Sequence, residues 1–347
     1  MSRCSSRPDP LAPALLEALY NAGGIPISGT RLAQRLGLTR AAVWKHMQSL
    51  RAKGYAIESV PRRGYRLASV PAALERDMLM PWLGGTLFTP ARCVVLAEAD
   101  SSNRVAADMA RAGCPEGTLV VVEHQSAGRG RLGRTWVAPP GCNLSFSLVL
   151  RPPILPGQAA QLTLLAALAL AETARGLGLP EARIKWPNDL LVQGLKVAGV
   201  LTEMDAEAER VRAVVVGVGI NVLGSVRQFP PELRQRVTTL AAALSPLSPP
   251  LRPAVLAAFL HHFEVWYQRW LTEGFAPIPA AWSAHAGSLG QSVCVHQGRE
   301  TFCGIARGLD EQGFLLVEHA DGSLTRVVSG DVLPAADPPH DPTAAAP

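Results

Sequence analysis

Several chemical signatures are absent from this chain of 347 residues, and each absence excludes a class of protein. None of its six cysteines forms a CxxC pair, and no His/Cys cluster has the spacing of a zinc site. The longest apolar run, residues 164–171, is too short to span a bilayer, and residues 1–10 lack the apolar core of a secretory signal. We therefore expect a cytoplasmic protein with reduced thiols, no membrane partner and no metal site built from a protein cluster.

Charged residues are scarce, at 18% of the chain, whereas apolar residues make up 48%, so the chain can bury a substantial core. The charge is also unevenly distributed. Residues 1–70 hold eleven Lys and Arg against three Asp and Glu, whereas the rest of the chain has a small acidic excess. A basic segment on a mildly acidic body indicates that only this segment meets a polyanion.

Two common enzyme motifs are missing as well. The chain has no GxSxG nucleophile elbow, and residues 217–219 (GVG) do not extend to the GxGxxG of dinucleotide sites. What it does have is a loop at residues 128–136 (GRGRLGRTW), in which three glycines alternate with three arginines. Glycine lets a ligand approach the backbone closely, and Arg donates hydrogen bonds to phosphate and carboxylate. Such a loop suits two anions brought together, although similar loops also occur as solvated turns or nucleic-acid contacts.

Four further motifs accompany this loop in a fixed order. They are residues 100–103 (DSSN), 185–190 (KWPNDL), 196–200 (KVAGV) and 217–221 (GVGIN). In this order and spacing, from about Leu11 to Leu333, the chain resembles the biotin–protein ligases. Its basic amino-terminal segment resembles that of their bifunctional form, the biotin operon repressors. One departure is that Val332-Leu333-Pro334 stands where the family often has a basic residue near the nucleotide.

The pattern of elements predicts an α+β protein of several domains. Residues 11–70 read as helix, helix, turn, helix and basic hairpin, which is a winged helix-turn-helix. Residues 91–286 mix helices with strands of a mainly antiparallel or mixed sheet, which the resemblance implies is a ligase domain like those for biotin and lipoate. Residues 288–334 read as a small SH3-like barrel. Residues 71–90 are expected to be a linker and residues 335–347 a disordered tail.

The resemblance implies a reaction in two steps. ATP and biotin would give biotinyl-5′-AMP and diphosphate, with Mg²⁺ on the phosphates, and no enzyme nucleophile is needed. A lysine of a biotin carboxyl carrier protein, a subunit of acetyl-CoA carboxylase, would then accept the biotin. The resemblance also implies repression of biotin biosynthesis at operator DNA, with biotinyl-5′-AMP as corepressor and a homodimer as the binding form.

The resemblance assigns roles to residues of these motifs. The residues expected in catalysis are Arg131, Arg134, Asp189 and Lys196. The residues expected at biotin are Ser101, Ser102, Asn103, Gln125, Arg129, Gly130, Arg131 and Lys196. The residues expected at ATP are Arg131, Arg134, Lys185, Asn188 and Asn221. Asp189 is a candidate partner of Lys196, of the ribose or of Mg²⁺, and Asn221 equally suits a turn at a strand end.

The basic head is expected to bind DNA through its third helix and its wing. The residues expected there are Arg40, Lys45, Gln48, Arg62 and Arg63. Arg and Gln can read base edges in the major groove, whereas Lys and the wing arginines more often hold phosphates. Trp44 is expected to pack at the edge of the domain. Trp136 could pack the Gly/Arg-rich loop onto the sheet, but an ordinary core position is the favoured reading. An ordinary helical hairpin with a solvated basic face is the alternative reading of this segment.

Two other functions remain open. One is a biotin-sensing repressor that has lost catalysis, and the other is a lipoate–protein ligase, which shares the fold. The intact set of Arg and Lys residues argues against the first. The GRGRLGRTW and KWPNDL motifs resemble the biotin branch rather than the lipoate branch.

Overall fold

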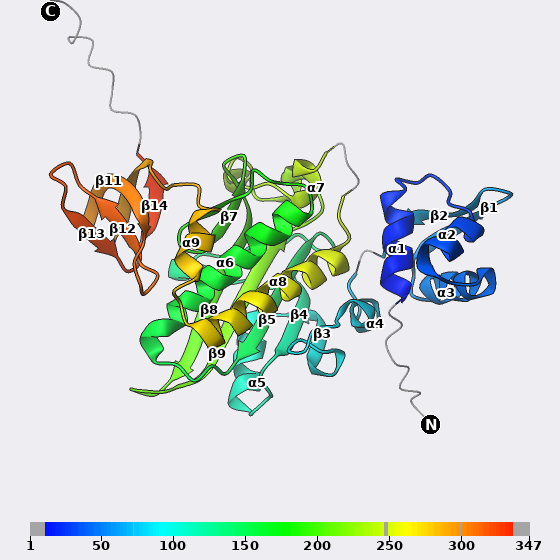
Figure 1. Ribbon diagram of the computed structural model, residues 1–347, viewed down its shortest axis with the longest axis horizontal. Helices are drawn as coiled ribbons and strands as arrows, with labels where there is room; N and C mark the ends of the chain where they lie inside the picture. The colour runs from blue at the N-terminus through cyan, green and yellow to red at the C-terminus, as the bar shows by residue number, and fades with distance from the viewer. Residues whose placement is uncertain (1–10, 72, 246–248, 299, 336–347) are drawn as a thin grey trace, which may run out of the picture.

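The computed structural model describes residues 11–71, 73–245, 249–298 and 300–335 (Figure 1). Within these ranges the chain forms a helical head, a central sheet covered by helices and a small β-barrel, which confirms the predicted α+β architecture. All of the predicted tail except Ala335 lies outside the described residues. Among the helices described, none combines the length and apolar character needed to cross a membrane.

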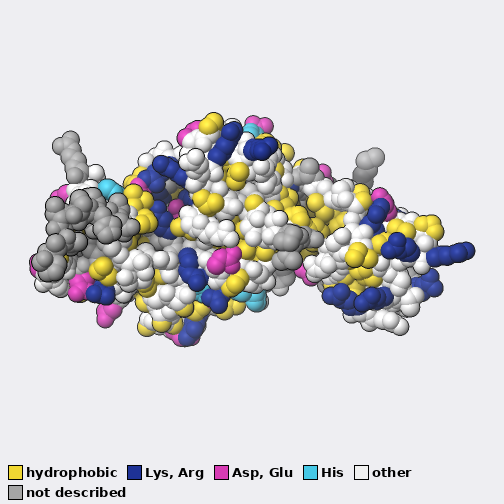
Figure 2. All heavy atoms as spheres, turned by 90° about the horizontal axis from the view of Figure 1, so that it is seen from above, with side chains coloured by type: hydrophobic (Ala, Val, Ile, Leu, Met, Phe, Trp, Pro, Cys, Tyr) yellow, Lys and Arg dark blue, Asp and Glu magenta, His cyan; other side chains and the backbone are white. Residues whose placement is uncertain are grey.

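The head is a winged helix-turn-helix, as predicted. Its elements are α1 (Leu11–Asn21), α2 (Gly29–Leu36), α3 (Arg40–Ala52), β1 (Ala56–Val60) and β2 (Gly64–Ser69). Ser28 and Thr39 begin α2 and α3 because each side chain accepts a hydrogen bond from a backbone N–H in the first turn. Gly37 ends α2 in the left-handed conformation, which glycine adopts without strain. Lys and Arg side chains gather over this head (Figure 2).

The segment expected to be a linker is packed structure rather than a free connector. It contains α4 (Arg76–Leu79) and a short 3₁₀ turn, η1 (Met80–Trp82). Leu79 and Phe88 are buried in the core of the body, whereas Met78 is buried in the core of the head. Apolar side chains spaced along this segment therefore pack it against both the head and the body. The length of the segment alone does not predict this packing.

A seven-stranded mixed sheet forms the body, with strand order β3-β4-β5-β9-β8-β7-β6. Its strands are β3 (Cys93–Ala99), β4 (Thr118–Gln125), β5 (Asn143–Leu150), β6 (Arg183–Lys185), β7 (Asp189–Val192), β8 (Leu195–Ala206) and β9 (Val211–Asn221). Strands β3 and β4 are parallel, and the other neighbours are antiparallel. The prediction of a mixed sheet is confirmed.

Helices cover both faces of this sheet because its strands are apolar on both sides. On β4, Val121 faces the core that holds α6 (Ala159–Gly176) and α8 (Arg252–Glu273). Its neighbours Val120 and Val122 face the core beneath α5 (Ser102–Arg111). In Figure 1, α6 and α8 lie side by side across the sheet. The short helices α7 (Leu240–Ala243) and α9 (Ile278–Ser283) complete the body.

The barrel has five antiparallel strands in the order β13-β12-β11-β10-β14. They are β10 (Ser292–Gln297), β11 (Glu300–Leu309), β12 (Leu315–Glu318), β13 (Leu324–Val327) and β14 (Asp331–Pro334). Side chains from all five strands, among them Val295 and Val317, join the main core of the body. The barrel is therefore packed onto the body.

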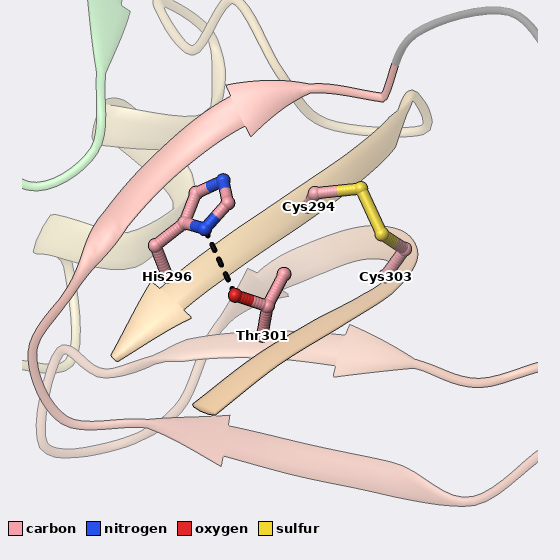
Figure 3. The surroundings of a disulfide bond; sticks show 4 residues. All are labelled: Cys294, His296, Thr301 and Cys303. Carbon is pink, nitrogen blue, oxygen red and sulfur yellow. Dashed lines mark hydrogen bonds between the residues drawn. A yellow bond between two sulfur atoms is a disulfide. The ribbon is translucent and has the colours of Figure 1, made fainter. Parts of the chain in front are cut away.

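The prediction of reduced thiols is wrong for one pair, because Cys294 and Cys303 form a disulfide. The register of β10 and β11 places them directly opposite each other, with Cα atoms 4.1 Å apart (Figure 3). His296 and Thr301 form the next opposed pair on the same face of this hairpin, with Nδ1 and Oγ1 3.0 Å apart. A search for CxxC spacing misses a pairing that depends on hairpin register.

We expect Phe259→Ala to destabilise the body by about 3–5 kcal/mol, because the lost ring would leave a cavity in the core. Phe259 is fully buried, with its ring centroid 5.2 Å from that of Phe146 and 5.9 Å from that of Phe263. Urea unfolding followed by tryptophan fluorescence measures the change. The matched control is Val265→Ala on the exposed side of the same helix, which should change stability by less than about 0.5 kcal/mol.

Candidate active site and nucleic-acid interface

A cavity of about 1290 Å³ lies where the Gly/Arg-rich loop, the sheet and the last strand of the barrel meet. All residues predicted for biotin, ATP and catalysis line it. They are Ser101, Ser102, Asn103, Gln125, Arg129, Gly130, Arg131, Arg134, Lys185, Asn188, Asp189, Lys196 and Asn221. Motifs spread over more than a hundred residues of sequence therefore converge on one site.

One end of the cavity is a buried polar pocket at the start of α5. Ser102 and Asn103 are buried, and the Ser102 backbone N–H donates to Gln125 Oε1 at 2.7 Å. Ser147 Oγ lies 2.8 Å from Ser102 Oγ and 2.6 Å from Asn103 Oδ1. Ser147 comes from the middle of β5, and nothing in the motifs singled it out. Hydroxyl and amide groups held in this way suit a neutral polar ligand group.

A carboxylate on β8 joins this pocket to the Gly/Arg-rich loop. Glu203 accepts a hydrogen bond from Asn103 Nδ2 at 2.8 Å and pairs with Arg129 at 2.9 Å. Arg129 is about half exposed, so this ion pair contributes little to stability and can exchange for a ligand anion. Sequence reasoning missed Glu203, because its place opposite the loop depends on the pairing of β8 with β9.

Cationic groups occupy the middle of the cavity. Lys196 Nζ lies 2.6 Å from Asp189 Oδ1, which is one of the partnerships expected for Asp189. Arg131 donates to Asn188 Oδ1 at 3.1 Å, and Asn188 Nδ2 donates to the Val200 carbonyl at 2.8 Å. Burial lowers the pKa of the Arg131 guanidinium, an effect that nearby Asp189 opposes. Arg side chains keep their charge in proteins, so this group can attract an anion.

The barrel supplies one wall of the cavity. Arg134 of the loop forms an ion pair with Asp331 at the start of β14, and residues 332–335 continue the lining. This is the place where the sequence departs from the family pattern. Asp331 was not predicted, because its contact with the loop depends on how the barrel packs on the body.

The close approach of two side chains, Trp136 and Asn103, explains the two glycines of the GVGIN motif. A Cβ atom at Gly219 would overlap the Trp136 ring, and one at Gly217 would overlap the Asn103 amide. Trp136 therefore holds the loop against β9, and its ring centroid lies 5.7 Å from Lys196 Nζ. The favoured reading of Trp136 as plain core is wrong, because the residue is only half-buried and lines the cavity. The loop is also closed by a hydrogen bond from Gly130 N–H to the Arg134 carbonyl at 2.7 Å.

Asn221 serves the strand end and the cavity together. Its side chain is 2% exposed, accepts from Asn143 Nδ2 at 3.1 Å and donates to the Thr238 carbonyl at 3.1 Å. Both readings of its sequence position are thus compatible with the structure. The KWPNDL turn contains a cis Trp186–Pro187 peptide bond.

The residues predicted for DNA share one side of α3 and the tip of the wing. Arg40, Lys45, Arg62 and Arg63 are exposed, and Gln48 is half-buried. The prediction that Trp44 packs at the domain edge is wrong, because its side chain is 56% exposed. Trp44 follows Arg40 and precedes Gln48 by four residues each, so it lies in their stripe, away from buried Val43 and Met47.

We expect Gly219→Ala to displace the Trp136 ring and with it the loop, since β9 backbone cannot yield easily. Because the loop would then no longer lie on the sheet, the affinity for biotin and ATP, the ligands that the sequence resemblance implies, should fall strongly. Isothermal titration calorimetry of both ligands measures the loss. The control is Gly157→Ala, where a Cβ meets no atom within 4 Å. Equal affinities in the two variants would contradict this account of the loop.

Comparison with known proteins assigns the three parts of the chain to families. Residues 96–221 match the Biotin/lipoate A/B protein ligase family, residues 13–66 match an HTH domain, and residues 288–333 match the Biotin protein ligase C terminal domain. A biotin protein ligase from Aquifex aeolicus, solved in complex with biotin and ATP, superposes with a TM-score of 0.60 at 28% identity. The superposition covers 70% of this chain and 97% of that one.

Relatives also match along nearly the whole chain. The Bifunctional ligase/repressor BirA of Bacillus subtilis (strain 168) is 38% identical over 318 residues, which cover 92% of this chain and 97% of the relative. The Bifunctional ligase/repressor BirA of Escherichia coli (strain K12) is 34% identical over 325 residues, which cover 93% and 97%. Together with the cavity and the winged head, these matches show that the chain belongs to the family of bifunctional ligase/repressor proteins.

Proposed function

We propose that this protein is a biotin–protein ligase and a transcriptional repressor. It activates biotin with ATP to biotinyl-5′-AMP and transfers the biotin to a lysine of a biotin carboxyl carrier protein in the cytoplasm. Bound biotinyl-5′-AMP also acts as corepressor at an operator of biotin biosynthesis genes. The observation that carries this proposal is the single cavity in which the Gly/Arg-rich loop, the KWPNDL turn and Lys196 meet.

The first step must bring a carboxylate to a polyphosphate. Two unit charges about 4 Å apart repel by roughly 4 kcal/mol at an effective dielectric of 20. Arg131 and Lys196 offset this repulsion at the point where the biotin carboxylate attacks the α-phosphorus. The new O–P bond forms as the bond to diphosphate breaks, and fixed cations stabilise the charge that develops.

Lys196 is suited to the junction of the two anions because Asp189 holds its ammonium at the cavity wall. An ammonium on a flexible stem can follow the charge as the bond forms. Arg134 has a comparable arrangement at the outer rim, where Asp331 holds it. We assign Arg134 to the outgoing phosphates and Lys185 with Asn188 to the nucleotide.

In the second step the acceptor lysine amine attacks the acyl carbon of the mixed anhydride. The C–N bond forms, AMP departs with the electrons of the C–O bond, and the amine loses a proton. The protein forms no covalent bond in either step. The polar pocket at Ser102, Asn103 and Gln125 holds the biotin ring and so fixes the carboxylate against the loop.

Mg²⁺ fits this site as a companion of the nucleotide rather than as a resident ion. The described residues contain no group of three or more His, Cys, Asp or Glu that would hold a metal by itself. Asn188 and Asp189 line the cavity and carry side-chain oxygens, which are the ligands that Mg²⁺ prefers. Bound there with the phosphates, it would neutralise part of their charge.

The repressor activity needs two heads. A homodimer favoured by biotinyl-5′-AMP would place its two winged heads at half-sites roughly 34 Å apart or a multiple of that distance. Because a ligand that prefers the dimer must stabilise it, biotinyl-5′-AMP and operator DNA should each raise the affinity for the other.

Diphosphate release distinguishes the proposed ligase from the two alternatives. The protein with MgATP should release diphosphate when biotin is added and should not do so with lipoate. Release with lipoate alone would identify a lipoate–protein ligase. No release with either acid, together with measurable biotin binding, would identify a sensing repressor without catalysis.

We expect Arg131→Ala to lower the rate of adenylate formation by about 100- to 1000-fold, the usual cost of removing one donor that stabilises developing charge. The measurement is single-turnover diphosphate release with saturating biotin and MgATP. Arg111→Ala, which removes an exposed cation at the end of α5, is the control and should leave the rate unchanged. An Arg131→Ala rate within error of wild type would remove Arg131 from the proposed chemistry.

The proposed DNA contacts predict a change in salt dependence. Arg62→Ala and Arg63→Ala should each weaken DNA binding for all sequences and lower the slope of log K against log salt by about 1. Gln48→Ala should instead change the sequence preference at one base pair. Fluorescence anisotropy on promoter DNA at several salt concentrations measures both effects. Arg210→Ala on the exposed body is the control, and a slope lowered equally by it would contradict the assigned interface.

A further inference from the structure

A buried ion pair lies between the cavity and the head. Arg252, the first residue of α8, has a side chain 3% exposed, and Glu123 on β4 is 11% exposed. Arg252 donates to both carboxylate oxygens, at 2.9 and 3.0 Å. Neither residue is among the described residues that line the cavity. Because apolar residues of similar volume often stabilise a core as well as a buried ion pair does, stability alone is a weak reason for this one.

Glu123 also holds two backbone segments that are distant in sequence. Its Oε2 accepts from the Leu74 N–H at 3.0 Å, and its Oε1 accepts from the Gly141 N–H at 3.2 Å. Leu74 lies on the segment that leads from the wing into the body. Gly141 lies five residues after Trp136, between the Gly/Arg-rich loop and β5. One carboxylate thus bonds to the exit of the loop and to the connection of the head.

The head rests on the elements that this pair fixes. Leu251, directly before Arg252, and Met78, four residues after Leu74, are buried in the core of the head. Ala254 in the first turn of α8 packs against the same core. In Figure 1, α4 lies between the sheet and α1, and the short turn η1 contacts both α1 and α8. A shift of Leu74 or Arg252 would therefore move the residues on which the head packs.

The Glu123–Arg252 pair is also connected to residues that line the cavity. Gln125, two residues after Glu123 on the same side of β4, accepts the hydrogen bond of Ser102 in the polar pocket. Arg252 donates to the Asn143 carbonyl at 3.1 Å, and the Asn143 side chain donates to Asn221 at the cavity wall. A ligand that orders the loop therefore acts on residues that are bonded to the pair.

We propose that Glu123 and Arg252 are positioning residues that couple the ligand loop to the DNA-binding head. A ligand held by the loop fixes the position of Gly141. Glu123 links the backbone at Gly141 to the backbone at Leu74, and Arg252 holds the first turn of α8 against the head. This inference rests on the proposed function, because it takes biotin and ATP as the ligands of the cavity.

Two substitutions break the coupling with little change in shape. Glu123→Gln replaces one acceptor oxygen by an NH₂ group, which cannot accept from Leu74, Gly141 or Arg252. Arg252→Met keeps an apolar stem and removes the charge. Arg252→Lys should rescue the coupling, since the bonds of Arg252 to both oxygens of Glu123 and to the Asn143 carbonyl all leave Nη1, and an ammonium offers three donors. Glu116→Gln is the matched control, a part-buried carboxylate that accepts from Arg151 N–H and Tyr267 O–H.

The test is hydrogen–deuterium exchange of the full chain with and without biotin and MgATP. We expect ligand to slow exchange of cavity peptides over residues 185–200 and of junction peptides over residues 70–82 in the wild type. In Glu123→Gln and Arg252→Met the junction response should be lost while the cavity response remains. Arg252→Lys and Glu116→Gln should keep both responses.

Each other result has a separate meaning. A junction response that persists in Glu123→Gln and Arg252→Met would overturn the coupling. A wild-type cavity response without a junction response would overturn it too. If neither region of the wild type responds, biotin and ATP are not the ligands of the cavity. The proposed coupling is then overturned because the proposed function is wrong.

Discussion

Repulsion between a carboxylate and a polyphosphate is the constraint on which the site depends. Water can separate such anions, so a protein that joins them must hold fixed cations at short range in a partly closed cavity. Here the cations come from a loop and from a hairpin that are distant in sequence. Trp136 packs the loop against Gly219 of β9, and Asp189 of β7 pairs with Lys196 of β8 in the facing hairpin. The rest of the body serves to keep these two elements in register.

Three of the cations are themselves restrained by carboxylates. Arg129 pairs with Glu203, Arg134 with Asp331, and Lys196 with Asp189. These three pairs keep cationic side chains near the cavity without burying unpaired charge. Since each pair is at least partly exposed, a ligand anion can compete for the cation at small cost. The three pairs therefore hold these cations at the cavity, where a ligand anion can take the place of the carboxylates.

Much of this site was predictable because its residues cluster in short motifs. GRGRLGRTW, KWPNDL and DSSN each place several functional residues side by side in the sequence. The order and spacing of these motifs limit the protein families that the chain can resemble. Ser147, Glu203 and Asp331 were not predictable, because each joins the site through strand register or through packing of the barrel. The Cys294–Cys303 disulfide escaped prediction for the same reason. Trp44 shows another limit, since an apolar side chain suggests burial even where helical position exposes it.

The central claim is that one cavity activates biotin and passes it to a protein. Mass spectrometry of a biotin carboxyl carrier domain, after incubation with this protein, biotin and MgATP, tests that claim most directly. The account predicts one added biotin on one lysine, dependent on ATP and absent with Arg131→Ala at the same time point. An acceptor that gains no mass, while the protein is folded and biotin is bound, would contradict it.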